Sequence, residues 1–155
     1  MSPLAPVEIA ITVRGSVDDA FRTFTDGFGS WWPRKTHSVG REKTSVVALE
    51  NHRGGEIYER TDDGTRHIWG RVVAWEPPHR IVFTWHPGRA EETAQEVEIL
   101  FRYVGDVTEV RLCHRNWEVL GEDGERVRSS YLSGWQLVLG QSYREAAEGR
   151  QEVPR

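Results

Sequence analysis

Cysteine is almost absent from this sequence. Cys113 is the only one, so no disulfide can form within the chain, and neither a Cys-x-x-Cys pair nor a cysteine and histidine cluster with zinc-finger spacing is present. A chain that needs no disulfide fits a reducing compartment, and we expect a cytoplasmic location.

Long apolar runs and an excess of positive charge are also lacking. Residues 1–13 contain neither a basic segment nor a long apolar stretch, so we expect no secretory signal and no membrane span there. The 20 Lys and Arg residues are outnumbered by 24 Asp and Glu, giving a net charge of −4. Binding to phosphate backbones needs a basic surface, so nucleic acid is not an expected partner.

Motifs for metal binding, cofactor binding and nucleophilic catalysis are missing as well. No two of the six histidines stand at i, i+2 or i, i+4, so no metal site is expected. Acidic pairs such as Asp62-Asp63 fall in turns, and the inward strand faces that can be assigned carry no Asp or Glu, which argues against paired catalytic carboxylates. Cys113 and Ser129-Ser130 lack the context of a nucleophile. We therefore expect no metal and no cofactor, and we assign no catalytic residue.

Tryptophan, by contrast, is abundant, with seven residues spread over nearly the whole chain. Such large rings fill hydrophobic cores, and they also line apolar ligand sites. The aromatic content is therefore the first indication of a binding function.

The N-terminal part predicts a strand followed by short helices. Apolar residues alternate over residues 7–14, which is typical of a half-buried strand. Ser16 is placed to cap a short amphipathic helix that runs to about Phe24. Residues 27–33 indicate a second short helix or a loop that stops at proline, and residues 34–43 are expected to form an exposed loop.

The middle of the chain predicts six further strands in an antiparallel meander. Their ranges are residues 44–50, 56–61, 66–75, 80–86, 96–103 and 109–115. Asp63-Gly64 favours a type I′ turn between the second and third of these strands, and Gly105-Asp106 favours a type II′ turn between the last two.

One long helix ends the fold. It is expected to begin after Asp123-Gly124 and to run to about Ala147, with a stripe of apolar residues that includes Tyr131 and Trp135. About 23 residues at 1.5 Å each give roughly 34 Å, enough to cross a sheet. Residues 148–155 are polar and are expected to be frayed. The whole chain, residues 1–155, is therefore predicted to be one domain with its core at about residues 7–147.

This order of elements predicts an α+β fold in which a curved antiparallel sheet of about seven strands wraps around the long C-terminal helix. Two short helices follow the first strand. A curved sheet cannot close against one helix everywhere, so an elongated apolar cavity is expected between them.

Several segments resemble one known family. They are the strand and helix at residues 13–24, Trp31-Trp32, Gly54-Gly55, Gly70 followed by Glu76-Pro77-Pro78, the strand at residues 81–85, residues 110–114, and Gly134-Trp135. Together they resemble the activator of heat-shock protein ATPase homologue-like family of the START-like, or SRPBCC, superfamily. The resemblance covers about residues 7–147 and implies the helix-grip fold. The superfamily includes lipid and hormone carriers, polyketide cyclases and chaperone regulators, so the fold alone does not specify the activity.

The candidate ligand-binding residues are aromatic or polar side chains predicted to face inward. They are Trp31, Trp32, Phe101, Tyr103, His114, Tyr131 and Trp135. His114 and Tyr131 are the polar members, and we expect each to bond the other, water or a ligand because unpaired buried polar groups are costly. Which face of residues 66–75 points inward stays open, so His67, Trp69 and Arg71 are unassigned.

Three functions compete at this point. The first is the binding of a hydrophobic or aromatic small molecule or lipid between sheet and helix. The second is a cyclase or dehydratase-like enzyme that uses the same pocket with His114 or Tyr131 as acid or base. The third is a co-chaperone-like module that binds a chaperone through its outer surface. We expect a monomer or a homodimer.

Overall fold

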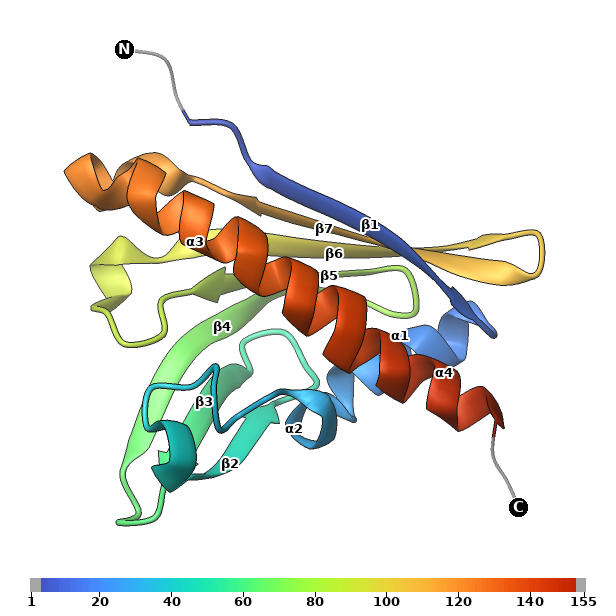
Figure 1. The fold of residues 1–155 in the computed structure, drawn as a ribbon, viewed down its shortest axis with the longest axis horizontal. Coiled ribbons are helices and arrows are strands. Elements are labelled where there is room, and N and C mark those ends of the chain that lie inside the picture. Colours follow the sequence, from blue (N-terminus) through green and yellow to red (C-terminus); the bar gives the residue numbers. More distant parts are fainter. Residues whose placement is uncertain (1–3, 153–155) are drawn as a thin grey trace.

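A computed structural model describes residues 4–152 and shows a seven-stranded antiparallel sheet that curls around a long C-terminal helix (Figure 1). The strands are β1 (Val7–Arg14), β2 (Thr44–Leu49), β3 (Glu56–Thr61), β4 (Arg66–Glu76), β5 (Arg80–Trp85), β6 (Gln95–Val104) and β7 (Val107–Arg115), in the spatial order β1-β7-β6-β5-β4-β3-β2. This is the predicted helix-grip fold, and the strand predictions are confirmed to within a few residues.

The long helix lies across the concave face of the sheet (Figure 1). It consists of α3 (Gly124–Leu137), a π-helical segment (Val138–Tyr143) and α4 (Arg144–Glu152), which follow one another without a gap. The helix therefore continues five residues beyond the predicted end at Ala147, through part of the segment expected to be frayed. Residues 153–155 of that segment lie outside the described residues.

Two short helices precede the meander, as predicted. In α1 (Val17–Thr25), the Ser16 hydroxyl accepts a hydrogen bond from the backbone N–H of Asp19 at 3.1 Å, which caps the helix. Helix α2 (Phe28–Trp31) ends just before Pro33. Both helices contribute aromatic side chains to the core.

The two predicted hairpin turns have different outcomes. Between β6 and β7, Gly105 has a φ of 68°, as the first central residue of a type II′ turn requires. Between β3 and β4, the type I′ prediction is wrong, because Gly64 has a φ of 87° whereas Asp63 has no positive φ. The Asp63 side chain instead accepts hydrogen bonds from the Thr61 hydroxyl at 2.7 Å and the Thr65 N–H at 3.0 Å, and this closes a longer loop.

A β-bulge explains why residues 66–75 could not be assigned to faces. Ile57 pairs with Gly70 while Tyr58 pairs with Ile68, so Trp69 is the extra residue on β4. The bulge shifts the inward and outward alternation: Trp69 is fully buried whereas Arg71 is exposed. His67 is half-buried opposite Glu59.

The core is one continuous cluster that joins the sheet to all the helices. Six of the seven tryptophans are buried in it, and Trp75 packs against its edge. Among the described residues, no helix is long and apolar enough to cross a membrane.

Candidate functional site

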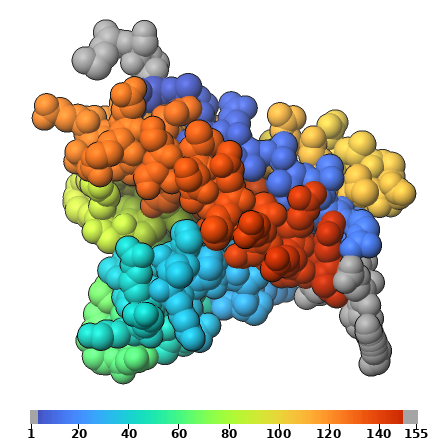
Figure 2. All heavy atoms as spheres, in the orientation of Figure 1, coloured from blue at the N-terminus to red at the C-terminus, as the bar shows by residue number. Residues whose placement is uncertain are grey.

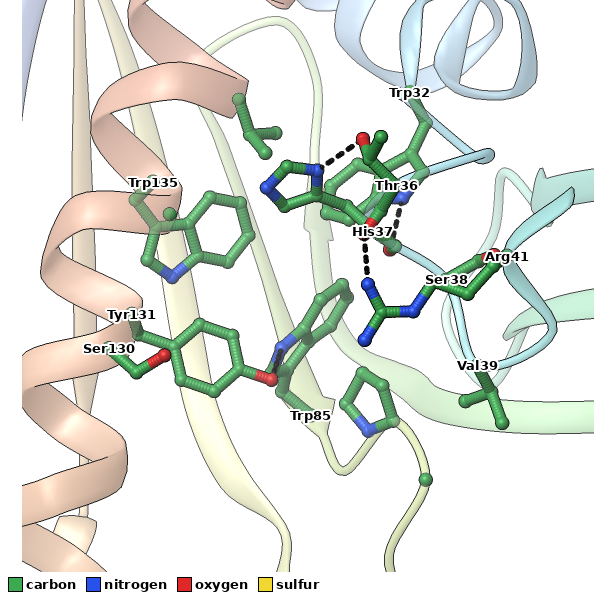
Figure 3. A pocket seen from close by; sticks show the side chains of 14 residues that line it. Trp32, Thr36, His37, Ser38, Val39, Arg41, Trp85, Ser130, Tyr131 and Trp135 are labelled. Carbon is green, nitrogen blue, oxygen red and sulfur yellow. Dashed lines mark hydrogen bonds between the residues drawn. The ribbon is translucent and has the colours of Figure 1, made fainter.

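A cavity of about 490 Å³ lies between α3, the end of β5 and the loop that follows α2 (Figure 3). Its lining residues are Trp32, Thr36, His37, Ser38, Val39, Arg41, Trp85, Pro87, Gly88, Ser130, Tyr131, Gly134, Trp135 and Val138. We call residues 36–41 the rim loop. In the space-filling view the rim loop (cyan) and α3 (orange) lie on the same face of the molecule (Figure 2).

The apolar wall of the cavity is built around three indoles, Trp32, Trp85 and Trp135, which we call the indole trio. Their ring centroids are 5.5 to 5.9 Å apart, within the range of favourable aromatic contacts. Trp32 follows α2, Trp85 ends β5 and Trp135 lies on α3. The trio is therefore assembled from segments far apart in the sequence.

Each indole N–H of the trio is bonded within the protein. Trp32 Nε1 donates to the His37 carbonyl oxygen at 2.8 Å, Trp85 Nε1 donates to the Tyr131 hydroxyl at 3.2 Å, and Trp135 Nε1 donates to His114 Nδ1 at 2.9 Å. The trio thus offers the cavity aromatic carbon surface. Tyr131 also lines the cavity. Burial raises the pKa of the Tyr131 hydroxyl, so this group is neutral near pH 7.

The rim loop supplies the polar side of the cavity. Thr36 Oγ1 and His37 Nδ1 are 2.8 Å apart, and Arg41 Nη1 donates to the Thr36 carbonyl oxygen at 2.9 Å. Burial, followed by the nearby Arg41 charge, lowers the pKa of His37. The imidazole is therefore mostly neutral at pH 7. Among the described residues that line the cavity, none is acidic.

A buried glutamate holds the rim loop in place. The Glu59 carboxylate accepts hydrogen bonds from the Val39 N–H at 2.7 Å, the Gly40 N–H at 2.8 Å, the Thr44 hydroxyl at 2.9 Å and Trp69 Nε1 at 2.8 Å. Its side chain is inaccessible to solvent. Glu59 thus lies on an inward strand face that was not among those assigned from the sequence. The strand period offered the signal, since Glu59 stands two residues after the inward-facing Ile57.

His114 is buried beneath the cavity and does not line it. Its Nδ1 accepts from Trp135 Nε1, and its Nε2 lies 3.0 Å from Gln95 Oε1. These partners indicate the tautomer with hydrogen on Nε2. Burial lowers the pKa of His114 to about 3. The Tyr131 ring lies 5.0 Å away by centroid, but the hydrogen-bond partners are Gln95 and Trp135.

The structure brings three of the seven candidate residues to the cavity: Trp32, Tyr131 and Trp135. Trp31 lies behind the wall, where its Nε1 donates to the Thr23 carbonyl oxygen at 2.8 Å. Phe101 and Tyr103 do not line the cavity, so their predicted place in the binding site needs correction. Phe101 faces inward as predicted but packs in the core against α1, and Tyr103 is 54 % exposed near the tip of the β6–β7 hairpin.

Sequence reasoning missed Trp85, His37 and Arg41 as members of the site. Trp85 was recognised as a strand residue, and its two-residue spacing from Phe83 could have placed it inward. His37 and Arg41 lie in a segment predicted to be an exposed loop. Their position depends on the hydrogen bonds between Glu59 and the rim loop, and no local sequence pattern predicts these bonds.

Comparison with known families gives one match over most of the chain. The model of the family described as activator of Hsp90 ATPase homolog 1-like protein matches residues 14–145. No curated protein matches the sequence.

Solved structures with the same fold include three that are informative. CalC from Micromonospora echinospora, a self-sacrificing resistance protein, is 25% identical with a TM-score of 0.70, over 97% of this chain and 98% of that one. The anthrahydroquino-gama-pyrone synthase Txn09, complexed with SUM, is 27% identical with a TM-score of 0.62, over 93% and 97%. The Aha1 dimer from Colwellia psychrerythraea is 18% identical with a TM-score of 0.63, over 94% and 97%, and this likeness concerns the fold alone.

Proposed function

The chain belongs to the activator of Hsp90 ATPase homolog 1-like family, and from this premise we propose that it binds an aromatic small molecule in the cavity beside the indole trio. The fold supports ligand binding or cyclase-like chemistry in general. The proposal narrows this to a ring-bearing ligand.

The indole trio is the observation that carries the proposal. Because all three N–H groups are bonded internally, a ligand meets them through their ring surfaces, which favour flat apolar partners. A cavity of about 490 Å³ is within the size range of small-molecule sites. A planar ligand of two or three fused rings matches both properties.

One related structure supports the same class of ligand. The synthase at 27% identity is named for a fused-ring product. The co-chaperone hypothesis rests on the family's name, since the structural likeness to the Aha1 dimer concerns the fold alone.

A second candidate function is catalysis on a ring-bearing substrate in the same cavity. The observation that favours it is the mostly neutral His37 imidazole, which lines the cavity beside Arg41. His114 is a poor candidate for the base, because both of its nitrogens are engaged and its pKa is about 3. In an enzyme of this kind, His37 would be the base.

The test of ligand binding uses tryptophan emission and thermal unfolding with a panel of flat aromatic compounds and, for contrast, saturated fatty acids. Aromatic compounds should quench emission saturably and raise the melting temperature, since a ligand at 100 times its dissociation constant adds about 2.7 kcal/mol of stability. A panel that changes neither emission nor melting temperature would contradict the proposal.

Two glycines of the long helix provide a matched pair of variants. A Cβ built on Gly134 or on Gly140 meets no atom within 4 Å, but only Gly134 lines the cavity. Gly134→Leu should fill cavity space and weaken aromatic binding about tenfold or more. Gly140→Leu should leave the affinity within about twofold of the wild type, because Gly140 lies in the π-helical segment outside the cavity lining.

A further inference from the structure

The contacts of the Thr36 hydroxyl are the basis for assigning the tautomer of His37. Thr36 Oγ1 lies 3.3 Å from the Pro33 carbonyl oxygen, to which its O–H donates. The same hydroxyl oxygen lies 2.8 Å from His37 Nδ1, and with its own hydrogen directed at Pro33 we assign it as the acceptor of an Nδ1–H. A neutral imidazole has one donor and one acceptor. With the proton on Nδ1, His37 Nε2 is the acceptor.

That acceptor nitrogen is on the cavity side of the ring. Figure 3 shows Nδ1 turned to Thr36 and the other ring nitrogen directed away from the rim loop, toward α3. Arg41 lines the same cavity and uses Nη1 to hold the Thr36 carbonyl oxygen at 2.9 Å. An acceptor and a cationic donor therefore face one space.

The charges around this space favour a partner with developing negative charge. The titratable or charged residues that line the cavity are His37, Arg41 and Tyr131, and Arg89 acts electrostatically on Tyr131. The nearby Glu59 carboxylate lies behind the rim loop, with its oxygens bonded to Val39, Gly40, Thr44 and Trp69. The accessible side of the site is thus positive.

We infer that the cavity selects aromatic ligands carrying an acidic hydroxyl, such as a phenol or an enol. The hydroxyl donates its hydrogen to His37 Nε2, and its oxygen accepts from the Arg41 guanidinium while the ring packs on the indole trio. An ether oxygen at the same position can accept from Arg41 but leaves Nε2 unpaired. This inference rests on the proposed binding of aromatic molecules and adds the group that the site recognises.

The experiment compares umbelliferone, a hydroxycoumarin, with its methyl ether by titration calorimetry. The pH is set below the ionisation of the free hydroxyl and above the pKa of His37. The hydroxyl compound should bind about tenfold more tightly or better, because the bound ether would cover Nε2 without giving it a hydrogen-bond donor. Equal affinities would overturn this inference and leave the proposed function standing. If neither compound nor any other aromatic binds, the proposed function itself fails.

Variants of the rim loop separate recognition from folding. His37→Phe keeps a ring but removes the acceptor. The affinity for umbelliferone should therefore fall to the affinity for its methyl ether, while the affinity for the ether and the melting temperature of the protein should not change. Arg41→Gln should reduce the ratio of the affinities for umbelliferone and its methyl ether severalfold. The control is His52→Phe, an exposed histidine outside the cavity lining; it should change nothing. A preference that survives His37→Phe would refute the role of Nε2.

Lowering the pH through the pKa of His37 gives an independent readout. Protonation converts Nε2 into a donor, so the preference for the hydroxyl should disappear in the wild type. A preference that is unchanged when His37 is protonated would overturn the inference. His52→Phe should show the same pH dependence as the wild type.

Discussion

At the scale of single residues, His114 shows how burial decides the role of a titratable group. Its partners Gln95 and Trp135 satisfy both ring nitrogens, and the ring stacks on Trp117 with centroids 4.0 Å apart. Removal from solvent lowers the pKa from 6.5 to about 3. His114 is therefore a neutral structural residue that orients Trp135, and through it one wall of the cavity.

This lowered pKa predicts a loss of stability in acid. As the pH falls below 6.5, the unfolded chain takes up a proton at His114 and the folded protein does not until about pH 3. The free energy of unfolding should therefore fall by about 1.4 kcal/mol per pH unit from this group alone. Urea unfolding at several pH values measures the slope.

Two variants test the role of His114. The free energy of unfolding of His114→Gln should be lower at pH 7 but should depend less on pH, whereas the exposed His52→Gln should keep the wild-type slope. Equal slopes for both variants would refute this role.

At the scale of elements, the rim loop depends on a contact with the sheet. Glu59 of β3 accepts from the backbone N–H groups of Val39 and Gly40 and from two side chains. These bonds fix the segment that presents His37 and Arg41 to the cavity. Glu59 thereby couples the stability of the β3–β4 region to the shape of the site.

Glu59→Gln should loosen the rim loop, because one acceptor oxygen becomes an amide that cannot accept from a backbone N–H. We expect a loss of about 1 to 3 kcal/mol in the free energy of unfolding, faster hydrogen exchange at Val39 and Gly40, and weaker aromatic binding. Glu56→Gln on the same strand is the control; it breaks a partly exposed ion pair with Arg66 and should cost under about 1 kcal/mol. Unchanged exchange at Val39 and Gly40 in Glu59→Gln would contradict the anchoring role.

At the scale of the whole molecule, one aromatic core connects the sheet to the long helix. Buried tryptophans come from β4, β5, α2, α3 and the segments that follow α2 and β7. Rings from distant elements touch one another, as in the contacts of Trp32 with Trp69, Trp85 and Trp135. Such shared packing favours cooperative unfolding of the proposed single domain.

Unfolding should accordingly be a single transition. Tryptophan emission reports the aromatic core, and far-ultraviolet circular dichroism reports the sheet and helices. In urea, the two signals should give the same midpoint and slope. Midpoints that differ beyond error would show that part of the chain unfolds separately and would contradict the assignment of residues 1–155 to one domain.

The elements of this fold could be predicted from the sequence because their signals are local. Alternation placed β1 at its observed ends, and the flanking Gly54-Gly55 and Asp63-Gly64 placed β3 at its own. Ser16 capped α1. The three-and-four spacing put Trp135 on the buried face of the long helix while Gln136 stays exposed. The order of these elements then predicted that the sheet wraps around the helix, and the family resemblance implied the same arrangement. Each of these inferences uses residues that are close together in the chain.

The cavity required the tertiary structure, because its residues meet only through long-range contacts. Trp69 faces inward owing to a bulge against β3, and that position lets its N–H reach Glu59. Glu59 in turn holds the rim loop against the cavity. Tyr103 keeps the inward parity of β6 and pairs with the buried Thr108, yet it is exposed near the tip of the hairpin. Bulges, sheet curvature and buried hydrogen bonds between distant residues have no periodic signature in a sequence, and these features decide which side chains line the site.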